Sequence, residues 1–157
     1  MDPELLFSRY YNLALKYISY RPRSEKEVYD YLEKKSKNSS NLTNEIILQI
    51  MAKLQGYKFI NDEEFVKFWV EQRINYKNKP LRVIEFELSQ KGVSKDLINE
   101  FLENYKNNGE TDLESAKKLA ERKLHFYRNL DETRKKEKVR NFLLRKGFSF
   151  DIVRKVI

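Results

Sequence analysis

The sequence has few of the residues that most often carry catalysis, metal binding and tight turns. It contains no cysteine and a single histidine, His125. The lack of cysteine excludes disulfides, thiolate nucleophiles, iron–sulfur clusters and thiolate zinc sites. One histidine excludes the usual histidine metal sites and most histidine-dependent triads. Four glycines and three prolines, about half the average share, encode few tight turns and disfavour an all-β fold.

Long apolar runs and targeting signals are also missing. No stretch approaches the roughly 18 apolar residues of a membrane span, and the first residues, Met1-Asp2-Pro3-Glu4, lack the basic region of a secretory signal. We therefore expect a cytoplasmic protein that does not enter a membrane.

Motifs of phosphate-binding loops, zinc proteases and nucleophile elbows are absent from the sequence. Carboxylate pairs such as Glu63/Glu64 and Glu85/Glu87 are present, but adjacent or i,i+2 positions on a helix do not converge on one point. His125 has no second histidine with which to share a metal. We therefore expect no catalytic residue, cofactor or metal, and we expect a surface to carry the function.

Positive charge is concentrated in the last third of the chain. The formal net charge is +8. Residues 1–56 have 9 basic and 7 acidic side chains, residues 57–108 have 9 of each, and residues 109–157 have 14 basic and 8 acidic. A polyanionic partner would explain this excess; the alternative is that Lys/Glu-rich helices simply expose a solvated face.

Apolar residues recur every three or four positions along almost the whole chain, which predicts amphipathic helices. The spacings Ser24-x-x-Glu27, Asn61-x-x-Glu64 and Thr111-x-x-Glu114 predict capping boxes or their asparagine variant. Asp2 before Pro3, Ser94 and Ser149 predict further helix starts, and Gly92 and Gly147 predict left-handed helix ends. We predict nine helices, over residues 3–20, 24–36, 43–55, 62–77, 80–91, 95–107, 112–128, 132–146 and 150–157.

The helices repeat in threes. The segment beginning Lys91-Gly92-Val93-Ser94 reappears 55 positions later as Lys146-Gly147-Phe148-Ser149, and self-similarity at such a period indicates a repeat array. We predict an all-α fold of three tandem three-helix repeats, residues 1–56, 57–108 and 109–157, forming an elongated, curved array. The apolar pairs of the second helices are Val28/Leu32, Ile84/Leu88 and Val139/Leu143.

Basic residues gather at corresponding places in the repeats. In each of the first two repeats a small group lies at the link into the second helix, and the densest group lies on the predicted helix 132–146. A stripe of such groups would suit a phosphate backbone or an acidic protein groove. The candidate binding residues are Arg21, Arg23, Lys26, Lys77, Lys79, Arg82, Arg122, Lys123, Arg134, Lys135, Lys136, Lys138, Arg140, Arg145 and Lys146.

Three ordered stretches of the chain resemble the RecX family of bacterial recombination regulators. They are residues 14–32, residues 56–73 beginning Gly56-Tyr57-Lys58-Phe59, and the paired Lys-Gly-[Val/Phe]-Ser elements. The first repeat departs from the family pattern, because the polar link from Ser36 to Asn41 replaces a glycine turn.

This resemblance implies tandem three-helix units and a partner, the RecA recombinase, especially its filament on single-stranded DNA. It implies a monomeric regulator without catalytic residues that binds this filament, commonly inhibits its ATPase and strand exchange, and touches DNA weakly and non-specifically. The alternatives are a self-sufficient, non-specific DNA-binding repeat protein, since three-helix units also occur in helix-turn-helix domains, and an inert helical scaffold.

Overall fold

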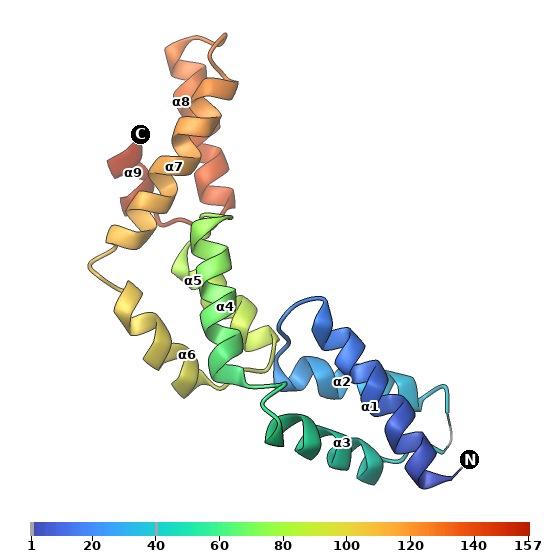
Figure 1. The fold of residues 1–157 in the computed structure, drawn as a ribbon. Helices are drawn as coiled ribbons and strands as arrows, with labels where there is room; N and C mark the ends of the chain where they lie inside the picture. The colour runs from blue at the N-terminus through green and yellow to red at the C-terminus, as the bar shows by residue number, and fades with distance from the viewer. Residues whose placement is uncertain (1, 40) are drawn as a thin grey trace. The chain divides into compact units, whose positions relative to one another are not determined.

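The computed structural model describes residues 2–39 and 41–157, and in these residues the chain forms nine α-helices, one short 3₁₀-helix and no strand (Figure 1). The prediction of an all-α repeat fold is confirmed. Every predicted helix is present, with ends that agree within two residues except at the end of the sixth. The elements are α1 (Pro3–Ser19), α2 (Glu25–Ser36), α3 (Asn44–Gly56), α4 (Asp62–Asn75), α5 (Leu81–Gln90), α6 (Lys95–Leu102), η1 (Glu103–Tyr105), α7 (Glu110–Phe126), α8 (Glu132–Arg145) and α9 (Phe150–Val156).

Most predicted helix starts carry the expected caps. The Ser24 hydroxyl accepts the Glu27 N–H at 3.1 Å, and the Glu27 carboxylate accepts the Ser24 N–H at 2.9 Å, which completes a capping box. The Asp2 carboxylate accepts an N–H at the start of α1, and the Ser149 hydroxyl accepts one at the start of α9. The Asn61 carboxamide oxygen accepts two N–H groups of the first turn of α4. These side chains satisfy amide groups that have no partner inside the helix.

Two local predictions are wrong. Thr111 does not begin α7: the helix starts at Glu110 after Gly109, whose φ is 81°, and the Thr111 N–H donates to the Asn107 carboxamide at 3.1 Å. The helix predicted to end at residue 107 ends at Leu102 and continues as η1. No residue from 103 to 109 is buried, so packing does not stabilise a further α-helical turn, and the asparagines in this segment disfavour one.

Each repeat buries the apolar positions that define it. The six second-helix residues, Val28, Leu32, Ile84, Leu88, Val139 and Leu143, are all fully buried. Helices α1, α2 and α3 enclose one core around Ala14 and Ile50, and α7, α8 and α9 enclose another around Ala116 and Val153. A shared apolar register therefore builds a small core in the first and in the third repeat.

The chain forms two compact units whose limits differ from those of the repeats. The first unit comprises the chain through Phe68 together with Ser89–Lys95, and the second comprises Trp69–Leu88 together with Asp96–Ile157. The first half of α4 and the turn after α5 thus belong to the first unit, while the second half of α4, most of α5 and α6 after Lys95 belong to the second.

Each unit contains one junction between consecutive repeats, and the two junctions use equivalent contacts. Asp62 at the start of α4 accepts the Glu25 N–H of α2 at 2.9 Å. In the other unit, Asp112 in the first turn of α7 accepts the Leu81 N–H of α5, also at 2.9 Å. The second helix of a repeat is thus capped by an aspartate from the first helix of the next. Burial raises the pKa of both carboxyls despite these hydrogen bonds.

Candidate partner-binding surface

Basic residues of the third repeat lie on the exposed side of α8. Val139 and Leu143 face the core, Lys135, Phe142 and Leu144 are partly buried, and the other positions of this helix are open to solvent. Lys135 pairs with Glu132 at 3.1 Å and its side chain is only 17% exposed. The exposed predicted residues here are Arg134, Lys136, Lys138, Arg140, Arg145 and Lys146.

Lysines of α7 and α8 lie over aromatic rings. The Lys123 Nζ atom is 4.5 Å from the centroid of the Phe142 ring and 5.3 Å from that of Phe126, which is 69% exposed. A cation over a ring is held by the quadrupole of the ring. These residues combine positive charge with an exposed aromatic ring, as protein surfaces that bind single-stranded nucleic acid do. We call the aromatic–lysine cluster the residues Lys123, Phe126, Tyr127, Lys138, Phe142 and Lys146.

Arg122 lies nearby on α7 and is exposed. In the amide orientation that satisfies both of its polar atoms, the buried Asn78 accepts from Arg122 Nη2 at 3.3 Å and donates to the Ile74 carbonyl at 3.2 Å. This predicted binding residue therefore also braces the α4–α5 link.

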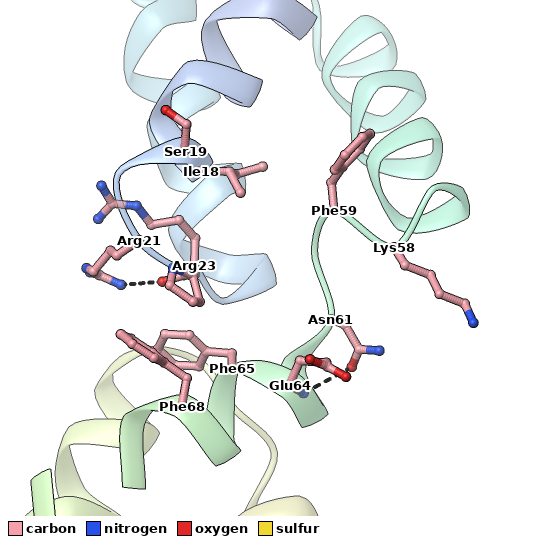
Figure 2. A pocket seen from close by; sticks show the side chains of 11 residues that line it. Ile18, Ser19, Arg21, Arg23, Lys58, Phe59, Asn61, Glu64, Phe65 and Phe68 are labelled. Carbon is pink, nitrogen blue, oxygen red and sulfur yellow. Dashed lines mark hydrogen bonds between the residues drawn. The ribbon is translucent and has the colours of Figure 1, made fainter. Parts of the chain in front are cut away.

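The first unit contains a cleft of about 520 Å³ between the α1–α2 link and the α3–α4 link (Figure 2). Arg21 and Arg23 lie on one side, Lys58 and Phe59 lie on the opposite side, and Phe65 and Phe68 lie between them (Figure 2). The sequence prediction missed this cleft, because its two walls come from links that are far apart in the chain. The remaining lining residues are Ile18, Ser19, Pro22, Asn61 and Glu64.

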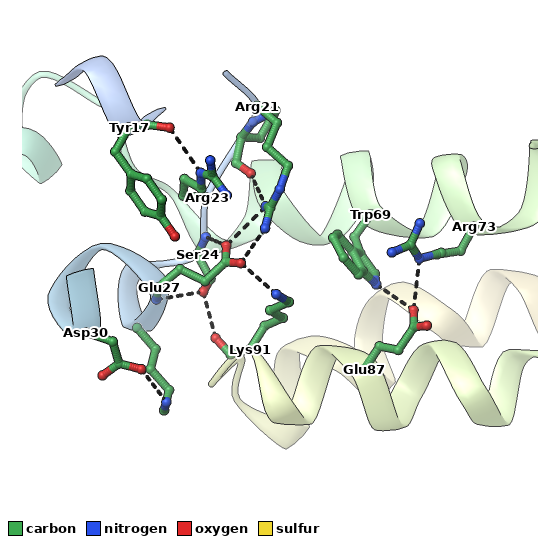
Figure 3. A network of polar contacts seen from close by, with 12 residues as sticks. Tyr17, Arg21, Arg23, Ser24, Glu27, Asp30, Trp69, Arg73, Glu87 and Lys91 are labelled. Carbon is green, nitrogen blue, oxygen red and sulfur yellow. Dashed lines mark hydrogen bonds and ion pairs between the residues drawn. The ribbon is translucent and has the colours of Figure 1, made fainter. Parts of the chain in front are cut away.

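The basic group of the first repeat is held by contacts within the first unit (Figure 3). Arg21 donates to the Glu27 carboxylate at 2.6 and 3.2 Å. The Arg23 Nε atom donates to the Tyr17 carbonyl at 3.1 Å, and its guanidinium lies 3.8 Å from the centroid of the Tyr17 ring. Lys26 pairs with Asp30 at 2.6 Å. These predicted binding residues therefore have structural roles of their own.

Glu27 is the centre of this network. Besides Arg21, it pairs with Lys91 at 2.8 Å and accepts the Ser24 N–H, and its side chain is 10% exposed (Figure 3). Burial alone would raise the pKa of Glu27, but the hydrogen bonds from Arg21, Lys91 and the Ser24 amide outweigh it and lower the pKa to about 2. The carboxylate thus joins α2 to the turn after α5 inside the first unit.

A second carboxylate network holds Lys79, one member of the basic group of the middle repeat. Glu87 accepts from Trp69 Nε1 at 2.9 Å and from Arg73 Nε at 3.0 Å (Figure 3). It also pairs with Lys79. Burial raises its pKa, but these donors outweigh burial and hold the pKa below the usual value. Arg82 donates to the Gly147 carbonyl at 3.0 Å, whereas Lys77 is exposed.

Within the part of the chain that the structure describes, no group of three or more acidic or histidine side chains is arranged to hold a metal ion, and His125 is exposed. None of the helices over these residues has both the length and the apolar composition needed to cross a membrane.

Comparison with known proteins gives one family along the chain. Three family models match in order: RecX, first three-helix domain, over residues 11–37; RecX, second three-helix domain, over residues 61–102; and RecX, third three-helix domain, over residues 110–157. The crystal structure of RecX from Lactobacillus salivarius is 32% identical, with 96% of this chain and 93% of that chain covered and a TM-score of 0.71. This chain belongs to the RecX family.

Curated relatives in the RecX family are longer. The regulatory protein RecX of Bacillus licheniformis is 37% identical over 140 residues, which cover 89% of this chain and 51% of that protein. The regulatory protein RecX of Bacillus subtilis is 34% identical over 143 residues, covering 91% and 52%. This chain therefore spans about half the length of these relatives.

The family match confirms the resemblance predicted from the sequence. The three RecX domain models fall inside the three predicted repeats, while the boundaries at residues 56/57 and 108/109 stay predictions. These relatives are named as regulatory proteins, and the lack of a catalytic activity in this chain also stays a prediction, as do its fifteen binding residues. Most of these residues on α7 and α8, together with Lys77, are exposed, whereas Lys135 and the others of the first two repeats are paired within the units.

Proposed function

We propose that this RecX-family chain binds the RecA recombinase and its filament on single-stranded DNA, and that it inhibits the ATPase and strand-exchange activities of RecA. The observation that carries the proposal is the match of three successive domains to a family of regulatory proteins. The exposed cations of the third repeat support it, since a filament on DNA is a repetitive, anionic partner.

Binding through several repeats explains how weak contacts become a stable complex. Once one repeat is bound, the next acts at a high effective concentration, so contacts on the α7–α8 surface and on the earlier repeats add to one another. Inhibition then requires that the chain bind an inactive state of the filament more tightly than the active one. In this proposal the chain is a cytoplasmic monomer and contributes no catalytic group.

The test is ATP hydrolysis by RecA on single-stranded DNA, measured with increasing amounts of the chain. We expect the rate to fall and to level off as the filament becomes saturated. An unchanged rate at every ratio up to saturation would contradict the proposal.

Reversing the charge of the α8 surface should separate binding from folding. We expect the triple variant Arg134→Glu, Lys136→Glu, Lys138→Glu to need at least about tenfold more protein for half-maximal inhibition, because each reversal replaces an attraction to an anionic partner by a repulsion. Its circular dichroism should stay native, since the three side chains are exposed.

The matched control reverses the charge of three exposed lysines outside α8, with the substitutions Lys34→Glu, Lys37→Glu and Lys67→Glu. This control changes the net charge equally, and it should keep most of the inhibition. Equal losses in both triple variants would show that net charge matters and that the α8 surface has no special part.

The aromatic–lysine cluster favours a second candidate, a self-sufficient DNA-binding protein, because exposed rings and cations together suit unpaired bases. Titration with oligo(dT) across salt concentrations separates the two candidates. Our proposal expects weak binding without RecA, whereas tight binding with a steep negative dependence of log K on log salt would favour the second candidate.

A further inference from the structure

The end of α3 holds a lysine in a backbone conformation that suits glycine. Lys58 has φ of 59°, whereas the other residues with positive φ in residues 2–39 and 41–157 are Asn78, Asn108 and three glycines. Asparagine and glycine tolerate the left-handed region, and a long side chain is disfavoured there.

A comparison with α8 shows that this helix end does not require a lysine. Both helices end in the same pattern: the Phe59 N–H donates to the Leu54 carbonyl at 2.9 Å, as the Phe148 N–H donates to the Leu143 carbonyl at 3.2 Å. The left-handed position is Lys58 in α3 and Gly147 in α8. Gly56 lies two residues earlier, inside α3, where an added Cβ would meet nothing within 4 Å. Strain kept at such a position points to a use for the side chain.

The residue after Lys58 is unusual as well. In this type of helix end, the apolar residue that follows the left-handed position usually packs against the last turn. Phe59 instead remains 48% exposed and lines the cleft, while Leu54 is fully buried. An open aromatic ring thus forms one wall of the cleft, and Lys58 lies at its edge with its side chain extending outward (Figure 2).

The opposite wall carries cations that the fold holds in place. Arg23 is fixed by the carbonyl and the ring of Tyr17, and Arg21 by Glu27. Because these guanidiniums are already ordered, a bound anion would cost little side-chain entropy there. Between the walls, Phe65 and Phe68 provide an apolar floor.

The charge around the cleft selects the kind of anion. The first turn of α4, beside the cleft, carries Asp62, Glu63 and Glu64, and Glu64 lines the cleft itself. These carboxylates would repel an extended phosphate backbone, whereas a single carboxylate can reach the arginine wall with its apolar neighbour against Phe59. We propose that this cleft docks a short segment of a protein partner in which an acidic residue stands next to an aromatic one. The proposal deepens the proposed function, on which it rests in taking the partner to be a protein filament.

The probe is N-acetyl-Asp-Phe-amide, added to the ¹⁵N-labelled chain and followed by NMR. We expect saturable shifts of the Lys58, Phe59 and Asn61 amides at millimolar probe. N-acetyl-Asn-Phe-amide and N-acetyl-Asp-Ala-amide should each bind about tenfold more weakly, since each lacks one of the two groups that the cleft recognises.

Two variants test the walls. Lys58→Gly should weaken probe binding several-fold while raising the midpoint of thermal unfolding, because it removes a cation and relieves the left-handed conformation. If Lys58 had only a structural role, the substitution would change probe affinity and the midpoint of thermal unfolding in the same direction. Phe59→Ala should weaken binding about tenfold, and the control Leu48→Ala, which removes an equally exposed side chain of α3 outside the cleft, should bind as the wild type does.

Three results would overturn the proposal: no saturable shifts at these amides, unchanged binding in both wall variants, or displacement of the probe by oligo(dT), which would make the cleft a nucleotide site. The probe assay contains no RecA. Probe binding together with an unchanged RecA ATPase would therefore contradict the proposed function and leave the cleft as a peptide site.

Discussion

Replacing Glu27 by glutamine is expected to lower the free energy of unfolding by about 2 kcal/mol. Glutamine keeps the shape of the side chain and can still accept the Ser24 N–H, but it leaves the Arg21 and Lys91 cations without their carboxylate. Both cations are about two-thirds buried, with side chains 28% and 31% exposed, so water compensates only in part. Urea denaturation followed by far-UV circular dichroism at neutral pH measures the change.

The matched control is Asp30→Asn, which breaks the ion pair with Lys26. These two side chains are 49% and 54% exposed, so the expected loss is small compared with that of Glu27→Gln. If both variants lost the same stability, the Glu27 network would be worth no more than a surface ion pair.

The effect of Glu27 should depend on pH in a defined direction. A carboxyl whose pKa falls from 4.5 to about 2 on folding stabilises the fold above its unfolded pKa and loses this contribution as the pH falls through the folded pKa. The difference between wild type and Glu27→Gln should therefore be complete above about pH 5 and shrink steadily toward pH 2. Asp62 titrates in both proteins; its pKa is raised mainly by burial, which both share, and partly by the charge of Glu27, which the variant lacks. A difference that stays constant over this range would contradict the assignment.

Gly147→Ala is expected to cost about 2 kcal/mol of stability. Gly147 has φ of 100°, which an alanine rarely adopts, and an added Cβ would lie 2.7 Å from the Cγ2 atom of Val83. The backbone strain and the clash fall at the junction between the second and third repeats, where Arg82 also donates to the Gly147 carbonyl. The loss is measured by urea denaturation.

Gly56→Ala is the control for this substitution, because it adds the same methyl group at a helical position with nothing within 4 Å. It should raise stability by about 0.5 kcal/mol. A similar loss in both variants would show that the left-handed conformation and the Val83 contact are unimportant.

The repeats could be predicted because the signals that define them are local. Val28, Ile84 and Val139 lie at matching positions of a helical period, and burial follows directly from that period. The prediction failed where a local alternative competes. The Asn107 carboxamide oxygen accepts the Thr111 N–H, which the Glu114 side chain would accept in a capping box. Gly109, two residues earlier, precedes the helix instead.

The basic surface could be predicted only in part, because charge alone does not show which cations find partners. Lys91 reads as an exposed residue before a glycine turn, yet it pairs with Glu27 of another repeat. By contrast, α8 has many more cations than carboxylates, and all of its cations except Lys135 stay exposed. The cleft beside Lys58 could not be predicted either, because neither composition nor periodicity shows that a lysine adopts the left-handed backbone conformation.

The aspartate caps at the two junctions make neighbouring repeats thermodynamically dependent. The start of α2 gains its Asp62 partner only when α4 is in place, and the start of α5 gains Asp112 only when α7 is in place. Folding should therefore propagate by nearest-neighbour coupling, with a repeat stabilising the one before it. A fragment cut at a repeat boundary would lose the aspartate contact at the start of its second helix. Fragments designed from this chain should therefore retain the first turn of the following repeat.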